Sequence, residues 1–195
     1  MKKIDAIFML GPQGSGKGTQ ARLLAEKLRF FFWEMGGILR ANKDFVLANG
    51  ETVGEIMNRG EYLSDPQLLE ILNLKLPSIP ADKGIIFDAI PRRIGQAEFI
   101  LKWLAERGKK NLVTIFLNLP REESLRRLLL RAEIEKRPDD TPEAIQSRLK
   151  LYEEVTLPIL DYMRANTEFI EIDGRPSVSE VTKDIDRAIG LNSPS

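Results

Sequence analysis

The sequence contains neither cysteine nor histidine among its 195 residues. The absence of cysteine excludes disulfide bonds and metal sites built from thiolates. The absence of histidine removes the commonest general base and the commonest side-chain ligand of transition metals. Chemistry in this chain must therefore use lysine, arginine, carboxylates, hydroxyls, backbone groups and hard cations.

Long apolar runs and an excess of one charge are also missing. No apolar stretch approaches the roughly 20 residues of a membrane span, and the start, Met1-Lys-Lys-Ile-Asp5, lacks the apolar region of a signal peptide. We therefore expect a cytoplasmic protein with no membrane partner. The 29 basic residues balance 29 acidic ones, which argues against a nucleic-acid partner bound through a general positive field.

What the chain does contain is an alternation of short apolar runs with amphipathic segments. Buried strands are predicted at residues 4–10, 30–33, 84–88, 112–119 and 169–173. Helices are predicted at residues 17–28, 95–107, 141–164 and 178–189, and from about Arg121. Two further short helices are predicted within 36–60, with a break at Asn49-Gly50, and another begins at Pro66 behind a cap at Asp65. Pro158 can introduce a kink in the helix at 141–164. This order is typical of one α/β domain, residues 1–195, with a parallel sheet covered on both faces.

Two segments, residues 34–63 and 131–140, fit the alternation poorly. The second is strongly charged and is predicted to form a loop. Both are expected on the edge of the sheet where open α/β proteins bind ligands. We interpret them as insertions that cover a substrate, and ordinary surface connections are the alternative. The remaining core comprises residues 1–33, 64–130 and 141–195.

The segment Gly11-Pro-Gln-Gly-Ser-Gly-Lys17 fits the phosphate-loop pattern G-x-x-x-x-G-K between a predicted strand and a predicted helix. Its glycines let the backbone wrap tightly and point N–H groups inward, and the helix N-terminus adds a positive dipole. Lys17 can reach the β- and γ-phosphates of a nucleotide. The hydroxyl that usually follows this lysine comes one residue later, because Gly18 precedes Thr19.

Gly-Lys-Gly-Thr-Gln is the variant by which the chain resembles the adenylate kinase family, and the resemblance covers nearly its whole length. The other matching segments are Gly36-Gly-Ile-Leu-Arg40, Gly60-Glu-Tyr-Leu-Ser-Asp65, Asp88-Ala-Ile-Pro-Arg92 with Gln96, Arg127-Leu-Leu-Leu-Arg131, Arg137-Pro-Asp-Asp140, and Arg148-Leu-Lys-Leu-Tyr152 with Thr156 and Pro158.

The resemblance implies a P-loop NTPase fold with a five-stranded parallel sheet in the order 2-3-1-4-5, flanked by helices. It also implies a binding insertion for a nucleoside monophosphate (NMP) at about 34–63 and a short lid at about 131–140. The activity it implies is reversible phosphoryl transfer from ATP with Mg²⁺ to an NMP, by a monomer. Phosphoryl transfer asks mainly for positioning and charge neutralisation, which a chain without histidine can supply.

Site residues are likewise implied by the resemblance, position by position. ATP would be bound by Gly14, Ser15, Gly16, Lys17, Gly18, Thr19, Arg127 and Pro176. The NMP would be bound by Met35, Gly36, Arg40, Leu63, Ala89, Arg92 and Gln96. The residues around the transferred phosphoryl group would be Lys17, Arg92, Arg131, Arg137 and Arg148, and Asp88 would hold Mg²⁺ through water. Four arginines suit this task because the planar guanidinium binds phosphate in a bidentate manner.

The acceptor site departs from the family pattern. Met35-Gly36-Gly37 stands where the family has Thr-Gly-Asp, and Ala89 and Arg93 replace its glycine and threonine in Asp-Gly-Phe-Pro-Arg-Thr. AMP is the first choice of acceptor, because Gln96 and the Leu63 carbonyl are retained to read adenine. A kinase for another NMP, or a nucleotide-binding regulator with little turnover, are the alternatives.

Overall fold

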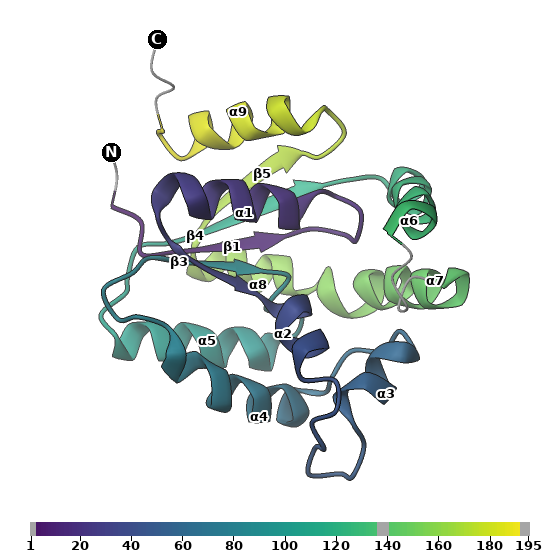
Figure 1. Cartoon of the computed structure of the whole chain (residues 1–195). Coiled ribbons are helices and arrows are strands. Elements are labelled where there is room, and N and C mark those ends of the chain that lie inside the picture. Colours follow the sequence, from purple (N-terminus) through teal and green to yellow (C-terminus); the bar gives the residue numbers. More distant parts are fainter. Residues whose placement is uncertain (1–2, 136–140, 192–195) are drawn as a thin grey trace.

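The computed structural model describes residues 3–135 and 141–191. All strand pairs in it are parallel, and they form one five-stranded sheet in the order β2-β3-β1-β4-β5 (Figure 1). The strands are β1 (Ala6–Leu10), β2 (Phe31–Glu34), β3 (Ile85–Asp88), β4 (Leu112–Asn118) and β5 (Glu168–Asp173). The strand order confirms the order that the resemblance implies.

Helices connect each strand to the next and lie on both sides of the sheet (Figure 1). They are α1 (Lys17–Leu28), α2 (Met35–Ala41), α3 (Val53–Asn58), α4 (Asp65–Lys75), α5 (Ile94–Glu106), α6 (Arg121–Glu135), α7 (Pro142–Leu151), α8 (Ile159–Asn166) and α9 (Val178–Ala188). Among the described residues, none of these helices has the length and apolar character needed to cross a membrane.

The core has two parts because successive side chains of a strand point to opposite faces of the sheet. In β1, Phe8 and its even-numbered neighbours pack with α4, α5 and α8, whereas Ile7 and Met9 pack with α1 and α9. Phe8 stacks on Phe87 of β3 with ring centroids 5.2 Å apart. This rigid centre fixes the carboxyl ends of β1, β2 and β3, where the candidate site lies.

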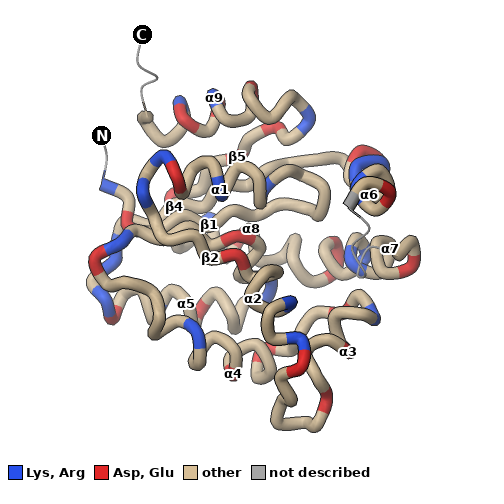
Figure 2. Tube along the Cα trace, in the orientation of Figure 1, with Lys and Arg blue, Asp and Glu red and all other residues tan. Residues whose placement is uncertain are grey.

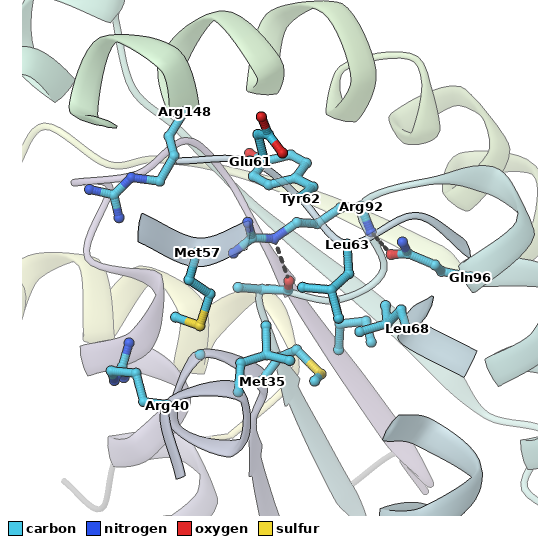
Figure 3. A pocket seen from close by; sticks show the side chains of 14 residues that line it. Met35, Arg40, Met57, Glu61, Tyr62, Leu63, Leu68, Arg92, Gln96 and Arg148 are labelled. Atoms are coloured by element: carbon cyan, nitrogen blue, oxygen red, sulfur yellow. Dashed lines mark hydrogen bonds between the residues drawn. The ribbon is translucent and has the colours of Figure 1, made fainter. Parts of the chain in front are cut away.

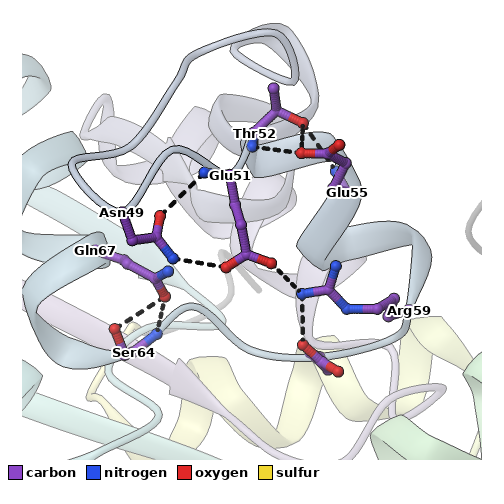
Figure 4. Close-up of polar contacts among 8 residues, drawn as sticks. Asn49, Glu51, Thr52, Glu55, Arg59, Ser64 and Gln67 are labelled. Carbon is purple, nitrogen blue, oxygen red and sulfur yellow. Dashed lines mark hydrogen bonds and ion pairs between the residues drawn. The ribbon is translucent and has the colours of Figure 1, made fainter.

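The segment 34–63 contains α2 and α3 and is closed by local polar contacts (Figure 4). Thr52 caps α3 by accepting a hydrogen bond from the Glu55 backbone N–H, while the Glu55 carboxylate accepts one from the Thr52 N–H. Arg59 bridges the carboxylates of Glu51 and Glu61 at 2.8 and 3.0 Å. These contacts stabilise the segment locally, while Leu47, Val53 and Ile56 bury their side chains in the main core.

Two details of the predicted elements were wrong. The cap of α4 is Ser64, whose N–H donates to the Gln67 side chain at 2.9 Å, and Asp65 is the first helical residue. Residues 131–135 belong to α6, which runs to Glu135, and are not part of a loop; the rest of the predicted loop, residues 136–140, lies outside the described residues. The kink predicted at Pro158 is confirmed, because a π-helical turn, Tyr152–Thr156, lies just before that proline and divides the helix predicted over 141–164 into α7 and α8. Proline cannot donate the hydrogen bond that a continuous α-helix requires.

Candidate functional site

The phosphate loop joins β1 to α1 at the carboxyl edge of the sheet. Gly11, Gly14 and Gly16 all have positive φ angles, of 147°, 82° and 85°. A Cβ at Gly11 would lie 2.6 Å from the Leu117 carbonyl oxygen, and one at Gly14 would lie 3.0 Å from that of Ser124. Both the backbone conformation and the packing therefore require glycine, and the loop is held against β4 and α6.

Lys17 is the first residue of α1, and its ammonium group turns back over the loop to donate to the Pro12 carbonyl at 3.1 Å. Loss of solvation on burial lowers the pKa of Lys17 from 10.5 to about 8, and the Asp88 carboxylate opposes this effect. Three nearby guanidinium groups lower the pKa further: those of Arg92, Arg131 and Arg148. The structure thus brings Lys17 and three arginines together beside the phosphate loop.

Four of the five residues expected around the transferred phosphoryl group are therefore brought together. Arg131 comes from α6, Arg148 from α7, and Arg92 from the loop after β3. Figure 2 shows basic and acidic residues interspersed along the described trace, so the positive charge at this centre is a local feature of a neutral protein. Arg137 lies outside the described residues.

Asp88 ends β3 beside the phosphate loop, and a Cβ at Gly18 would lie 3.1 Å from its Oδ2 atom. Its Oδ1 atom is buried and accepts no hydrogen bond within the described part of the chain. Burial raises the pKa of Asp88, with the Lys17 charge opposing and the Glu34 carboxylate adding to the rise. A carboxylate oxygen with spare acceptor capacity next to a phosphate site fits Mg²⁺, which prefers oxygen ligands and retains several waters.

That carboxylate is not part of a larger cage. Across residues 3–135 and 141–191, no group of three or more histidine, cysteine, aspartate or glutamate side chains could hold a metal ion. Any Mg²⁺ at Asp88 would therefore take its remaining ligands from phosphate oxygens and water.

Arg127 lies on the other side of the phosphate loop, where α6 meets the chain segment that follows β5. Its two Nη atoms donate to the Gly174 and Arg175 carbonyls, each at 2.9 Å, and its Nε atom donates to Glu123 at 2.6 Å. These contacts fix the plane of the guanidinium against the backbone of residues 174 and 175, which directly precede Pro176. A fixed guanidinium plane is a suitable surface for stacking a nucleotide base.

The seven residues expected to bind the acceptor line one cavity, open to solvent, between α2, α3 and the loop after β3 (Figure 3). Its lining comprises Met35, Gly36, Leu39, Arg40, Met57, Glu61, Tyr62, Leu63, Leu68, Ala89, Ile90, Arg92, Gln96 and Arg148. Arg40, Arg92, Arg148 and Glu61 supply charge, and most of the other side chains are apolar. A mostly apolar cavity with a few convergent polar groups has the composition of a small-molecule site.

Gln96 is 2% exposed, and both ends of its amide are already engaged. Its Oε1 atom accepts from the Arg92 N–H at 2.9 Å, and its Nε2 atom donates to Asp65 at 3.1 Å. Asp65, expected as a helix cap, instead orients this amide. Because each end of an amide has two hydrogen-bonding positions, Gln96 keeps one donor and one acceptor for a ligand.

Comparison with known proteins agrees with this arrangement. The sequence profile described as "Adenylate kinase" matches residues 9–168. Proteins named adenylate kinase from Thermus thermophilus and Phocaeicola vulgatus are 38% and 36% identical to the chain over 187 and 183 residues, covering 96% and 94% of this chain and 98% and 97% of theirs. A third, from Dehalococcoides mccartyi, is 33% identical over 209 residues, covering 94% of this chain and 97% of its own. The chain belongs to the adenylate kinase family.

Within this adenylate kinase site, Tyr62 is the functional candidate that the sequence analysis did not single out. Its hydroxyl accepts a hydrogen bond from Gln13 of the phosphate loop at 2.8 Å. Its ring lies under the Arg92 guanidinium, 4.4 Å from the centroid. Tyr62 therefore connects the donor loop to the acceptor cavity. It stands within the matched segment Gly60–Asp65, but nothing in the sequence assigns its ring a partner.

The geometry of Arg127 gives a first testable expectation for this adenylate kinase. Replacing Arg127 with glutamine removes the stacking surface and the contacts with residues 174 and 175, so we expect the KM for ATP to rise about tenfold while the KM for AMP is unchanged. Arg126→Gln is the matched control, because Arg126 also pairs with Glu123 but has no contact with those carbonyls. Equal effects of the two substitutions would place the base elsewhere.

Proposed function

We propose that the chain transfers a phosphoryl group reversibly between ATP and AMP, giving two molecules of ADP, and so maintains the balance of adenine nucleotides. The observation that carries this proposal is the position of Lys17. It belongs to the phosphate loop, it faces Arg92, Arg131 and Arg148, and Arg92 and Arg148 also line the acceptor cavity. One anion placed at this centre would contact both nucleotide sites.

ATP would bind with its phosphates in the loop of residues 14–19, whose backbone N–H groups and helix dipole favour negative charge. Lys17 would exchange its contact with the Pro12 carbonyl for phosphate oxygens. The base would lie against Arg127 and Pro176. The arrangement orients the γ-phosphate toward Arg92 and the cavity beyond it.

The acceptor would bind with its base in the apolar part of the cavity, between Met35, Leu63 and Ala89, and with the Gln96 amide at its edge. Its phosphate would lie between Arg40 and Arg92. The acceptor's attacking oxygen belongs to a phosphate that is mostly dianionic at neutral pH, so it needs no general base. This explains how the reaction proceeds in a protein without histidine.

In the transfer step, the acceptor phosphate oxygen forms a bond to the γ-phosphorus as the bond to the β,γ-bridging oxygen breaks. Negative charge then spreads over the transferred group and the leaving β-phosphate. Lys17, Arg92, Arg131 and Arg148 stabilise that charge from fixed positions, with Arg137 proposed to join them. The same contacts act in both directions, because the two products are both ADP.

Mg²⁺ is proposed as the cofactor, and its chemistry is to neutralise charge on the ATP phosphates. Asp88 would hold the ion through water, using the buried oxygen that has no partner in the described residues. We propose that residues 34–63 and the end of α6 with residues 131–140 close over the two nucleotides and exclude water. We also propose that the protein is a monomer and acts in the cytoplasm.

The test is ADP formation from Mg·ATP with AMP, UMP, CMP, GMP and dTMP measured side by side. We expect AMP to give a kcat/KM at least about tenfold above any other acceptor, because a buried hydrogen-bonding group that the wrong base leaves unpaired costs about 1 to 3 kcal/mol. A preference for another base would show that the changes at Met35 and Gly37 retuned the cavity. ATP binding without turnover of any acceptor would favour the regulator.

A further inference from the structure

Glu34 contacts the arginine that is expected to bind the acceptor phosphate. It is the last residue of β2, directly before α2, and its Oε1 atom accepts a hydrogen bond from the Nη2 atom of Arg40 at 3.0 Å. Its Oε2 atom lies 3.5 Å from Nη2 of Arg22 on α1. Glu34 precedes α2 as its N-cap residue, yet its side chain makes no capping hydrogen bond. The carboxylate therefore pairs with Arg40 and Arg22 instead of capping the helix.

The two glycines that open α2 provide the space for this ion pair. A Cβ at Gly36 would lie 3.2 Å from Nη1 of Arg40, so the guanidinium lies against the first turn of the helix. A Cβ at Gly37 would lie 3.2 Å from Cδ of Glu34 and 3.4 Å from both of its carboxylate oxygens. The carboxylate thus occupies the space in which a side chain at position 37 would begin. Glycine at position 37, where the family has aspartate, therefore leaves the space that the Glu34 carboxylate occupies.

We propose that Glu34 is an internal counter-anion that occupies Arg40 until the phosphate of the acceptor displaces it, and so determines how tightly the acceptor binds. This inference rests on the proposed function, because it takes Arg40 as the acceptor's phosphate ligand. Arg22 gives the displaced carboxylate a second partner.

Electrostatics fixes the direction of the effect. An acceptor phosphate carries nearly two negative charges at neutral pH. If Glu34 stays beside Arg40, the two anions repel each other, and if it turns away, its ion pair with Arg40 is lost. Both routes weaken acceptor binding. The side chains of Arg40 and Glu34 are 38% and 34% exposed, so water and salt reduce the effect to a modest one.

The experiment compares the full-length protein with its Glu34→Gln variant, in which the amide oxygen can still accept from Arg40 but carries no charge. We expect the KM for AMP to fall about three- to tenfold, with the KM for ATP unchanged. Adenosine, which has no phosphate, is the control ligand, and its inhibition constant against AMP should be unchanged. Glu34→Ser should shift the KM for AMP in the same direction, so the test does not depend on the folding of one variant.

Glu51→Gln is the matched control substitution, because Glu51 pairs with Arg59 in the same segment and is similarly exposed. It should leave the KM for AMP unchanged. A KM for AMP that is unchanged or higher in Glu34→Gln would overturn the proposal, since Glu34 would then be neutral or would position Arg40. Arg40→Met tests separately whether Arg40 binds the acceptor phosphate, as the proposed function requires. An unchanged KM for AMP in that variant would remove Arg40 from the acceptor site.

Discussion

Replacing Lys17 with methionine is expected to abolish most turnover and, at the same time, to stabilise the nucleotide-free protein. Turnover should fall by at least about 10²- to 10³-fold, because a fixed positive charge on the transferred group is lost. The gain in stability follows from the pKa of the Lys17 ammonium group, which is about 8 in the folded protein. The unfolded chain holds the same proton more tightly, near 10.5, so the fold is penalised whenever Lys17 is charged.

The sign and the pH window of this effect are set by those two pKa values. Below about pH 8 the lysine is charged in both states, and the full penalty, up to about 3 kcal/mol, acts against folding. The melting temperature of Lys17→Met at pH 7 should therefore exceed that of the unaltered protein by about 5 to 10 °C. Between pH 8 and 10.5 the folded protein loses the proton first, and the difference should shrink. Pro12 keeps a donor in the variant, because the Ser15 N–H also binds its carbonyl.

Lys27→Met on the same helix is the control with the opposite expectation. Lys27 pairs with Asp186, which is 4% exposed, so its loss leaves a buried carboxylate without its cation. That variant should lose stability and keep its turnover. A Lys17→Met protein that is less stable than the unaltered chain at pH 7 would contradict the interpretation and make Lys17 a structural residue.

Arg92→Lys is expected to lower kcat by about 10²- to 10³-fold, with a smaller change in the KM for ATP. Lysine keeps the charge but loses the planar fork, the contact of Nε with the Ala89 carbonyl at 3.0 Å, and the stacking over Tyr62. The group would then be free to move away from the transferred phosphoryl. Steady-state kinetics with both substrates varied gives the two constants.

Arg107→Lys provides the matched comparison. Arg107 lies over the Trp103 ring at 3.9 Å, an arginine–aromatic pair similar to that of Arg92, but it lies at the end of α5 that is remote from the phosphate loop. Its substitution should change stability slightly and leave kcat unaltered. A similar loss of kcat in both variants would mean that arginine stacking, rather than contact with the reacting group, explains the result.

The parts of this protein that could be predicted from sequence are those fixed by local chemistry. The phosphate loop is determined by glycines at required positive φ angles, and the strands are determined by continuous apolar runs, so both were located within a few residues. The strand order came from the resemblance alone. Periodicity carries no information about which strands are neighbours.

The parts that could not be predicted depend on contacts between distant segments. Asp65 was expected to cap a helix, because aspartate before proline usually does, yet it orients Gln96 from another helix. The role of Tyr62 depends on Arg92 and Gln13, and the role of Glu34 depends on the space over Gly37. Such partnerships are formed by packing of the complete fold, and the residues involved have no periodic pattern that would reveal them.

The contact of the last loop with the donor site has a consequence for how the protein is made. A Cβ at Gly174 would lie 3.4 Å from the Ser15 carbonyl of the phosphate loop, and Arg127 is held by the carbonyls of residues 174 and 175. During synthesis, a chain that has emerged only as far as β4 holds the phosphate loop without these partners. Nucleotide binding is therefore expected to stabilise a chain that includes residues 174 and 175 more than a shorter one. ATP should protect the full chain from proteolysis more than a chain that ends at β4.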